Sequence, residues 1–247
     1  MAIAFVQNKS SGSASTTTLA VTLPAAPANG NLVVVVIVTL TAKTITSVVD
    51  TNSVSYVQSP NSPATNANRG ADVWMYYKEN ITGGAAQINV TQSGSPQKMS
   101  LFAAEFSGVL TSGSLEIDVV HTGTAAQTNI NDPTLTTTNA DLLIGGASGS
   151  NITAVSGGWT AIDAIQNSVD WAEYFIQSVS GSKAVGFTQL SATQWAAIGA
   201  AFKAAPPPAA GGGGGVPFLG AIPSLGGGVE AGMQQPWQVL DTNLGGF

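Results

Sequence analysis

The sequence predicts an all-β protein: an antiparallel, jelly-roll-like β-sandwich with two similar halves, followed by an extended C-terminal arm rich in glycine and proline. Three observations carry this prediction. Short segments of alternating apolar and polar residues recur along residues 1–205, separated by turn-forming sequences such as Pro-Ala-Asn-Gly and Asn-Asp-Pro. The order of these segments repeats once within the chain. Residues 206–247 replace the alternation with runs of proline and glycine.

The expected strands follow from the alternation, because successive side chains of a strand point to opposite faces of its sheet. The longest apolar run, 32–40 (LVVVVIVTL), is rich in β-branched residues and too short to cross a bilayer as a helix, so we expect a strand buried on both faces. The alanine-rich segment 195–205 is also compatible with a helix. The expected strands are 3–7, 17–23, 32–39, 45–49, 55–58, 72–79, 86–91, 99–106, 115–121, 134–138, 142–147, 159–164, 171–178, 184–190 and 195–203.

The internal repeat divides the body, 1–205, into halves of about 1–112 and 113–205. Asn29-Gly-Asn-Leu-Val-Val-Val in the first half corresponds to Asn139-Ala-Asp-Leu-Leu-Ile-Gly in the second. Each half holds about seven strands, the size of an immunoglobulin-like sandwich, so two tandem sandwiches are an alternative to one body. We favour one compact body, because the connection between the halves is short and not rich in proline.

The arm, 206–247, joins a Pro-Pro-Pro segment to a run of five glycines and then to spaced apolar side chains. Its composition is typical of a stiff spacer followed by a flexible one. A spacer has no need of large apolar groups, and a glycine-rich segment cannot build its own core. We therefore expect the arm to bind a partner through Phe218, Leu219, Ile222, Leu225, Trp237, Leu240 and Phe247.

The composition excludes several classes of function. Charged residues are 8% of the chain, against a usual share of about 25%, and the formal net charge is −6. The seven Lys and Arg residues are scattered, so neither nucleic-acid binding nor a polybasic membrane anchor is expected. The chain has no cysteine, which rules out disulfides and thiolate metal sites. We expect no cofactor.

The sequence offers few catalytic groups. His121 is the only histidine, no G-x-S-x-G motif is present, and we expect His121 to be a polar residue at a strand end unless the fold brings a carboxylate to it. Glu116 and Asp118 are expected on one face of a strand, as a pair for glycoside hydrolysis would be. Glu105 lies within an apolar strand and is interpreted as an edge or interface residue. We therefore expect no catalytic residue and no enzyme activity.

Two further sets of residues have a functional and a structural interpretation. Carboxylates in Asn-rich loops could bind calcium, but they lack the spacing of a calcium loop, so we interpret Asp132, Asp141, Asp163 and Asp170 as turn residues and expect no metal site. Strand aromatics could stack on sugars, but at period two they more often pack in a core; these are Trp74, Tyr76, Tyr77, Trp159, Trp171, Tyr174 and Trp195.

A series of motifs in the body carries a resemblance to known proteins. In chain order they are Asn-Gly-Asn-Leu-Val-Val-Val (29–35), Trp74-Met-Tyr-Tyr, Ala-Ala-Glu-Phe-Ser-Gly-Val (103–109), Asp141-Leu-Leu-Ile-Gly and Gly158-Trp-Thr. In this order of motifs, residues 1–205 resemble a loose family of β-sandwich proteins found among phage virion proteins, such as head-decoration and tail-associated modules, and among bacterial surface proteins. The resemblance implies a structural or binding role and brings no catalytic residues. It does not extend to the arm.

Our leading expectation is a non-enzymatic virion structural protein on a phage capsid or tail. Its partners would be capsid or tail proteins and neighbouring copies of itself, as a homo-oligomer within an assembly, with a surface glycan as a further partner. The N-terminus lacks the basic and apolar regions of a secretory signal, which suits a virion surface reached by lysis. The alternatives are a secreted bacterial adhesin or carbohydrate-binding module on a cell surface, and a jelly-roll glycoside hydrolase.

Overall fold

The computed structural model describes residues 2–12, 15–40, 42–139, 141–164 and 169–207, and the chain divides into a unit of Met1–Pro208 and a unit of Ala209–Phe247. Every regular element in the described residues is a β-strand, and every strand pairing is antiparallel. No helix in these residues is long and apolar enough to cross a membrane. The arm residues expected to bind a partner, from Phe218 to Phe247, lie outside the described residues.

The first half of the chain contributes a large sheet and a small sheet. The first large sheet has the order β1-β9-β3-β7-β5, with β6 also paired to β7, and the first small sheet has the order β2-β8-β4. The strands are β1 (Ala4–Gly12), β2 (Thr18–Thr22), β3 (Leu32–Leu40), β4 (Ile45–Asp50), β5 (Val57–Gln58), β6 (Ala64–Asn66), β7 (Ala71–Lys78), β8 (Gln87–Gln92) and β9 (Met99–Ser107).

The second half repeats this plan. The second large sheet has the order β10-β17-β12-β15-β14, with β13 also paired to β17, and the second small sheet pairs β11 with β16. The strands are β10 (Leu115–Ile130), β11 (Thr134–Thr137), β12 (Asp141–Ser148), β13 (Ile152–Val155), β14 (Thr160–Ala164), β15 (Asp170–Ile176), β16 (Gly181–Ala184) and β17 (Phe187–Lys203). The two large sheets therefore share one topology, and the predicted β-sandwich with two similar halves is confirmed.

Strand β3 shows how the sheets are stacked. Its residues from Leu32 to Thr39 are all buried, as the uninterrupted apolar run predicts. Val33 and Val35 pack toward the first small sheet, whereas Val34 and Val36 pack toward the second large sheet. The first large sheet is therefore covered on both faces.

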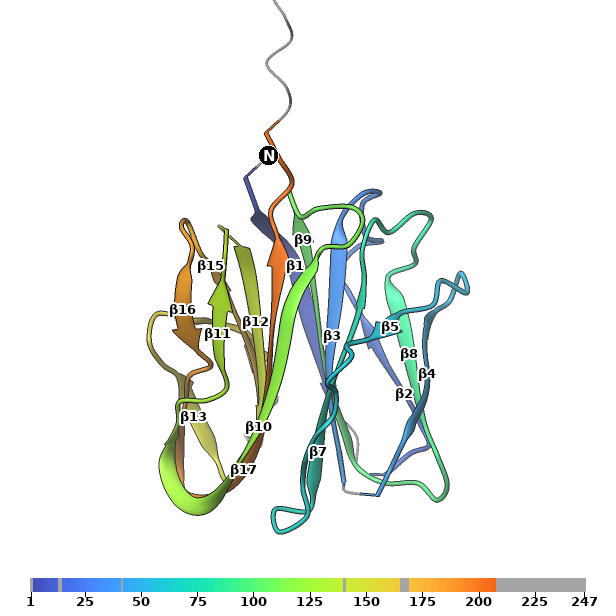
Figure 1. The fold of residues 1–247 in the computed structure, drawn as a ribbon. Helices are drawn as coiled ribbons and strands as arrows, with labels where there is room; N and C mark the ends of the chain where they lie inside the picture. The colour runs from blue at the N-terminus through green and yellow to red at the C-terminus, as the bar shows by residue number, and fades with distance from the viewer. Residues whose placement is uncertain (1, 13–14, 41, 140, 165–168, 208–247) are drawn as a thin grey trace, which may run out of the picture. The chain divides into compact units, whose positions relative to one another are not determined.

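The two large sheets pack face to face around one apolar core that both halves fill. Phe102 and Phe106 come from the first half, and Ile198 and Phe202 come from the second. Each small sheet packs on the outer face of its own large sheet around a further core. Figure 1 shows the resulting order, with the two large sheets side by side and a small sheet on either side of them.

The edges of the two large sheets are also joined. Strand β1 of the first half lies beside β14 of the second, where the Ser10 backbone N–H and hydroxyl donate to Asp163 Oδ2 at 3.1 and 3.0 Å. Strand β10, the counterpart of β1, lies beside β6 of the first half. Each half thus sets its first strand against the far edge of the other, as in a twofold-symmetric dimer.

Several elements differ from the sequence-based expectations. The strand expected at 3–7 runs on to Gly12, the strand expected at 115–121 runs on to Ile130, and the segments expected at 184–190 and 195–203 belong largely to one strand, β17. The helix considered at 195–205 is wrong, because this segment is a central strand between β10 and β12. Strands β6, β13 and β16 were not expected; all three are short and pair on one side only, which leaves little alternation to detect.

Candidate functional site

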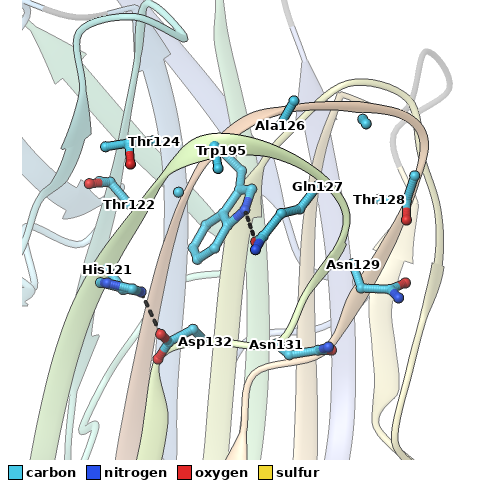
Figure 2. A pocket seen from close by; sticks show the side chains of 13 residues that line it. His121, Thr122, Thr124, Ala126, Gln127, Thr128, Asn129, Asn131, Asp132 and Trp195 are labelled. Carbon is cyan, nitrogen blue, oxygen red and sulfur yellow. Dashed lines mark hydrogen bonds and ion pairs between the residues drawn. The ribbon is translucent and has the colours of Figure 1, made fainter.

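A polar groove of about 730 Å³ lies under the second part of β10 in the described residues. We call it the β10 groove. Figure 2 shows β10 arching over it, with Trp195 of β17 inside the arch and polar side chains around the rim. The residues that matter most for its chemistry are His121, Gln127, Asn129, Asn131, Asp132 and Trp195.

The arch exists because β10 and β17 do not pair evenly. The register of their pairing shifts between Gly123 and Gln127, and again between Gln127 and Asn129. Bulges of this kind bend a strand and increase its twist. Between the shifts the side chains of β10 from Thr124 to Asn129 are exposed, so this segment is shaped by its pairing rather than by a core.

Trp195 forms the inner wall of the groove and is only 2% exposed. Its indole packs so closely on Gly123 that a Cβ at this glycine would lie 2.2 Å from Nε1. Only glycine therefore fits there. Trp195 Nε1 donates to Gln127 Oε1 at 3.3 Å, which joins the wall to the arch. The wall is thus fixed before any ligand binds.

His121 and Asp132 form a hydrogen-bonded pair at the mouth of the groove. His121 Nδ1 lies 2.5 Å from Asp132 Oδ2, and the side chains are 52% and 43% exposed. The fold thus supplies the carboxylate that the sequence alone could not place. Because Asp132 receives the Nδ1 proton, the other ring nitrogen is an acceptor when the imidazole is neutral. No hydroxyl or thiol in the described residues bonds to His121, so the pair has no nucleophile beside it.

Glu105, which the sequence places inside an apolar strand, is fully buried and holds the first half together. Its carboxylate accepts hydrogen bonds from Gln7 Nε2 at 2.5 Å, from the Ala28 N–H at 2.8 Å and from Asn31 Nδ2 at 2.6 Å. These donors come from β1 and from the loop before β3. Glu105 therefore fastens that loop to the edge of the first large sheet.

Glu116 and Asp118 do not come together as a catalytic pair. A register shift between Leu115 and Ile117 interrupts the alternation of β10 at this point. Asp118 is buried and accepts hydrogen bonds from the Ser59 hydroxyl and, at 2.7 Å, from the Asn61 N–H, both in the first half. Glu116 instead accepts from the Thr138 N–H and hydroxyl at 2.9 and 2.6 Å.

The carboxyl pair that the fold does create joins Glu116 to Asp141. Burial, together with the hydrogen bond and the charge of Glu116, raises the pKa of Asp141 to about 7. Burial also acts to raise the pKa of Glu116, but hydrogen bonds from Asp141 and Thr138 outweigh it, and that pKa lies below its ordinary value. The pair therefore holds one proton, on Asp141, in the mildly acidic range. Nothing in the sequence signals it, because the partners lie on different strands.

Two further buried carboxyl groups lie in the second large sheet. Burial raises the pKa of Glu173 well above its ordinary value, although the carboxyl accepts the Gly186 N–H at 2.7 Å. Burial likewise raises the pKa of Asp170, which accepts the Ser100 hydroxyl of the first half at 2.7 Å. Among the described residues no group of three or more His, Cys, Asp or Glu side chains could hold a metal ion.

The strand aromatics are mostly core residues. Trp74, Tyr76 and Trp159 are each 5–6% exposed and belong to the cores beneath the small sheets. Tyr77 and Tyr174 pack against the central core, where Tyr174 stacks on Phe5 with ring centroids 5.2 Å apart. Among the sequence-selected aromatics, Trp195 is the one that lines the β10 groove.

Comparison of the chain with protein-family models, curated proteins and solved structures gives no significant match. Function is therefore inferred from the sequence, the fold and the geometry of the sites.

Proposed function

We propose that this protein is a non-enzymatic structural component of a virion, a β-sandwich body displayed on a phage capsid or tail and anchored through its C-terminal arm. The observation that carries the proposal is the contrast between the body and the arm. The body fills its own cores, whereas residues 209–247 carry large apolar side chains in a sequence dominated by glycine.

The packing of the body is consistent with a body that is displayed and an arm that anchors it. Its three cores each lie between two sheets and are filled by residues from Val21 to Phe202. The large apolar side chains that the described residues expose come from widely separated segments, such as Phe5, Val57 and Leu190. The described body therefore fills its cores with its own residues.

The energetics favour a partner for the arm over isolation. Ordering a backbone residue costs about 1–2 kcal/mol, and more for glycine. Burying a large apolar side chain contributes about 1.5–3 kcal/mol, so several anchors can offset much of the ordering cost of their segment. Addition of an extended segment to a sheet edge would contribute main-chain hydrogen bonds as well. Shell proteins and neighbouring copies of this chain offer such surfaces.

One alternative is favoured by a specific observation. A secreted adhesin or carbohydrate-binding module would need a polar groove, and the β10 groove is one. A glycoside hydrolase needs two carboxyl groups about 5–9 Å apart with a sugar between them. Asp141, the partner of Glu116, is fully buried and so out of reach of a sugar, which speaks against a hydrolytic role for this pair.

The anchoring role is tested by adding purified chains to parent particles that lack the protein. A chain without residues 209–247 keeps the whole described unit and should fold, but it should not remain on particles through sedimentation. Replacing Phe218, Leu219, Trp237 and Phe247 by serine in the full chain should have the same effect. Replacing the polar arm residues Gln234 and Gln235 by serine is the matched control and should leave binding unchanged. Retention of the truncated chain at the level of the full chain would refute anchoring by the arm.

A further inference from the structure

We propose that the β10 groove is a binding site for an uncharged oligosaccharide. This site is separate from the arm and does not depend on what the arm binds, so it goes beyond the anchoring function. The size of the groove, the chemistry of its lining and the rigidity of its inner wall suit such a ligand.

The groove has the size of a ligand site. Its volume of about 730 Å³ lies within the range of about 300–1,000 Å³ that is usual for small-molecule sites in proteins. It lies under the arch of β10 (Figure 2) and is open to solvent, so a segment of a linear chain can lie in it. An open groove suits a polymer segment better than a compact metabolite that must be enclosed.

Alanines and Trp195 form the apolar part of the lining, and most of its polar side chains are neutral hydrogen-bonding groups. Hydroxyl groups come from threonines such as Thr122 and Thr128, and amides come from Gln127, Asn129 and Asn131. The lining contains no Lys or Arg, so a phosphate, sulfate or carboxylate would find no fixed positive partner there. Its one carboxylate, Asp132, already pairs with His121. A ligand with many hydroxyl groups and no charge matches this surface.

Several of these groups have unused hydrogen-bonding capacity. The side chains of Asn129 and Asn131 make no hydrogen bond within the described residues, and in Figure 2 both stand at the rim of the groove. Gln127 accepts the Trp195 N–H through Oε1, which leaves its amide NH₂ free to donate. His121 is oriented by Asp132 and offers its other ring nitrogen as an acceptor. The site therefore presents both donors and acceptors, as sugar hydroxyls require.

The rigid inner wall of the groove reduces the conformational entropy that side chains lose when a ligand binds. Trp195 is locked between Gly123 and the pairing of β17, and its ring meets that of His121 edge to face with centroids 5.6 Å apart. Because Trp195 is almost wholly buried, it does not act as a stacking platform for a sugar. Its role is to hold Gln127 and His121 in place, which reduces the side-chain entropy lost on binding.

The test measures binding of the full chain to an array of oligosaccharides that includes neutral, sialylated and sulfated members, followed by titration calorimetry with the strongest neutral binder. The proposal predicts that neutral glycans bind and that their charged counterparts do not bind more tightly. The double variant Asn129→Ala, Asn131→Ala should bind about tenfold more weakly or worse, because it removes the hydrogen bonds of two side chains to the ligand.

The matched control is Thr22→Ala, which removes an exposed strand side chain from the first small sheet, away from the groove. Its affinity and melting temperature should equal those of the wild type, and the melting temperature of the double variant should also be unchanged. The proposal is overturned if no glycan binds at millimolar concentration, if only anionic glycans bind, or if the double variant binds as tightly as the control.

Discussion

At the scale of single residues, three buried carboxyl groups join segments that are distant in the sequence. Glu105 joins β9 to the loop before β3, and Asp118 joins β10 to the loop after β5. Asp170 joins β15 to β9 across the two halves. Burying a carboxylate costs free energy unless it is hydrogen-bonded. These groups therefore stabilise the fold only in the arrangement that supplies their hydrogen-bond partners.

The Glu116–Asp141 pair predicts a dependence of stability on pH. The pKa of Asp141 is raised in the folded state, so between its unfolded value, near 4, and about 7 the folded protein binds more protons than the unfolded one. Stability from this group is present in mild acid and is lost as the pH rises through 7. The pKa of Glu116 is lowered, so its own contribution changes only below about pH 4.5.

We therefore expect Asp141→Asn, which mimics the protonated acid, to reduce the loss of stability between pH 5 and pH 8 by roughly 1–2 kcal/mol, after allowance for screening by solvent. Urea denaturation at the two pH values measures this difference. The control is Glu79→Gln: hydrogen bonds from Ser114 and Gly113 outweigh burial and lower the pKa of Glu79, so it titrates below this window. A pH dependence in Asp141→Asn equal to that of the wild type would contradict the assignment.

At the scale of elements, β3 and β10 show what the sequence can and cannot predict. The whole of β3 is recognisable because both of its faces are buried, which requires an unbroken apolar run. The second part of β10 is exposed and its pairing with β17 is irregular, so it has neither alternation nor an apolar run. A strand buried on both faces was therefore predictable from the sequence, whereas the full length of β10 was not.

The β10 groove was not predictable for the same reason. It depends on register shifts between β10 and β17, and these arise from pairing across more than sixty residues of sequence. His121 and Asp132 were each noticed in the sequence, but only the arch of β10 brings them to 2.5 Å. The sequence identified the residue types of the site and could not place them together.

Strand β12 gives a prediction at this scale, because it contacts the other half through a glycine. A Cβ at Gly146 would lie 2.5 Å from Val36 Cγ1 in β3, so the close approach of the two large sheets requires glycine here. We expect Gly146→Val to lower the free energy of unfolding by about 1–3 kcal/mol or more through overpacking. The control Ala154→Val, exposed on β13, should change it by less than about 0.5 kcal/mol. Equal effects of the two substitutions in denaturation curves would show that the sheets do not meet as described.

At the scale of the whole molecule, the central core makes the stability of each half depend on the other, because both halves contribute residues to it. Each half alone would expose one face of a large sheet, including Phe102 and Phe106 in the first half or Ile198 and Phe202 in the second. Exposed apolar faces of this size drive association. The shared core thus gives one stable body from two units that resemble separate sandwiches.

We accordingly expect residues 1–208 to unfold in one transition, with equal calorimetric and van't Hoff enthalpies. Residues 1–112 and 113–205, produced separately, should aggregate or bind hydrophobic dyes. Two resolved transitions in the scanning calorimeter, or soluble and monomeric halves with native-like near-ultraviolet circular dichroism, would contradict the shared core.

The central claim, that the protein is a virion component anchored by its arm, is tested most directly by cryo-electron microscopy of the particle from which the chain is purified. The account predicts a four-layered β body, two large sheets between two small ones, on the outer surface of a capsid or tail. It also predicts density for residues 209–247 against a shell protein or a neighbouring copy, with Phe218, Trp237 or Phe247 buried in that contact. Particles without this body, or a body attached through its sheets with the arm free of contacts, would contradict the claim.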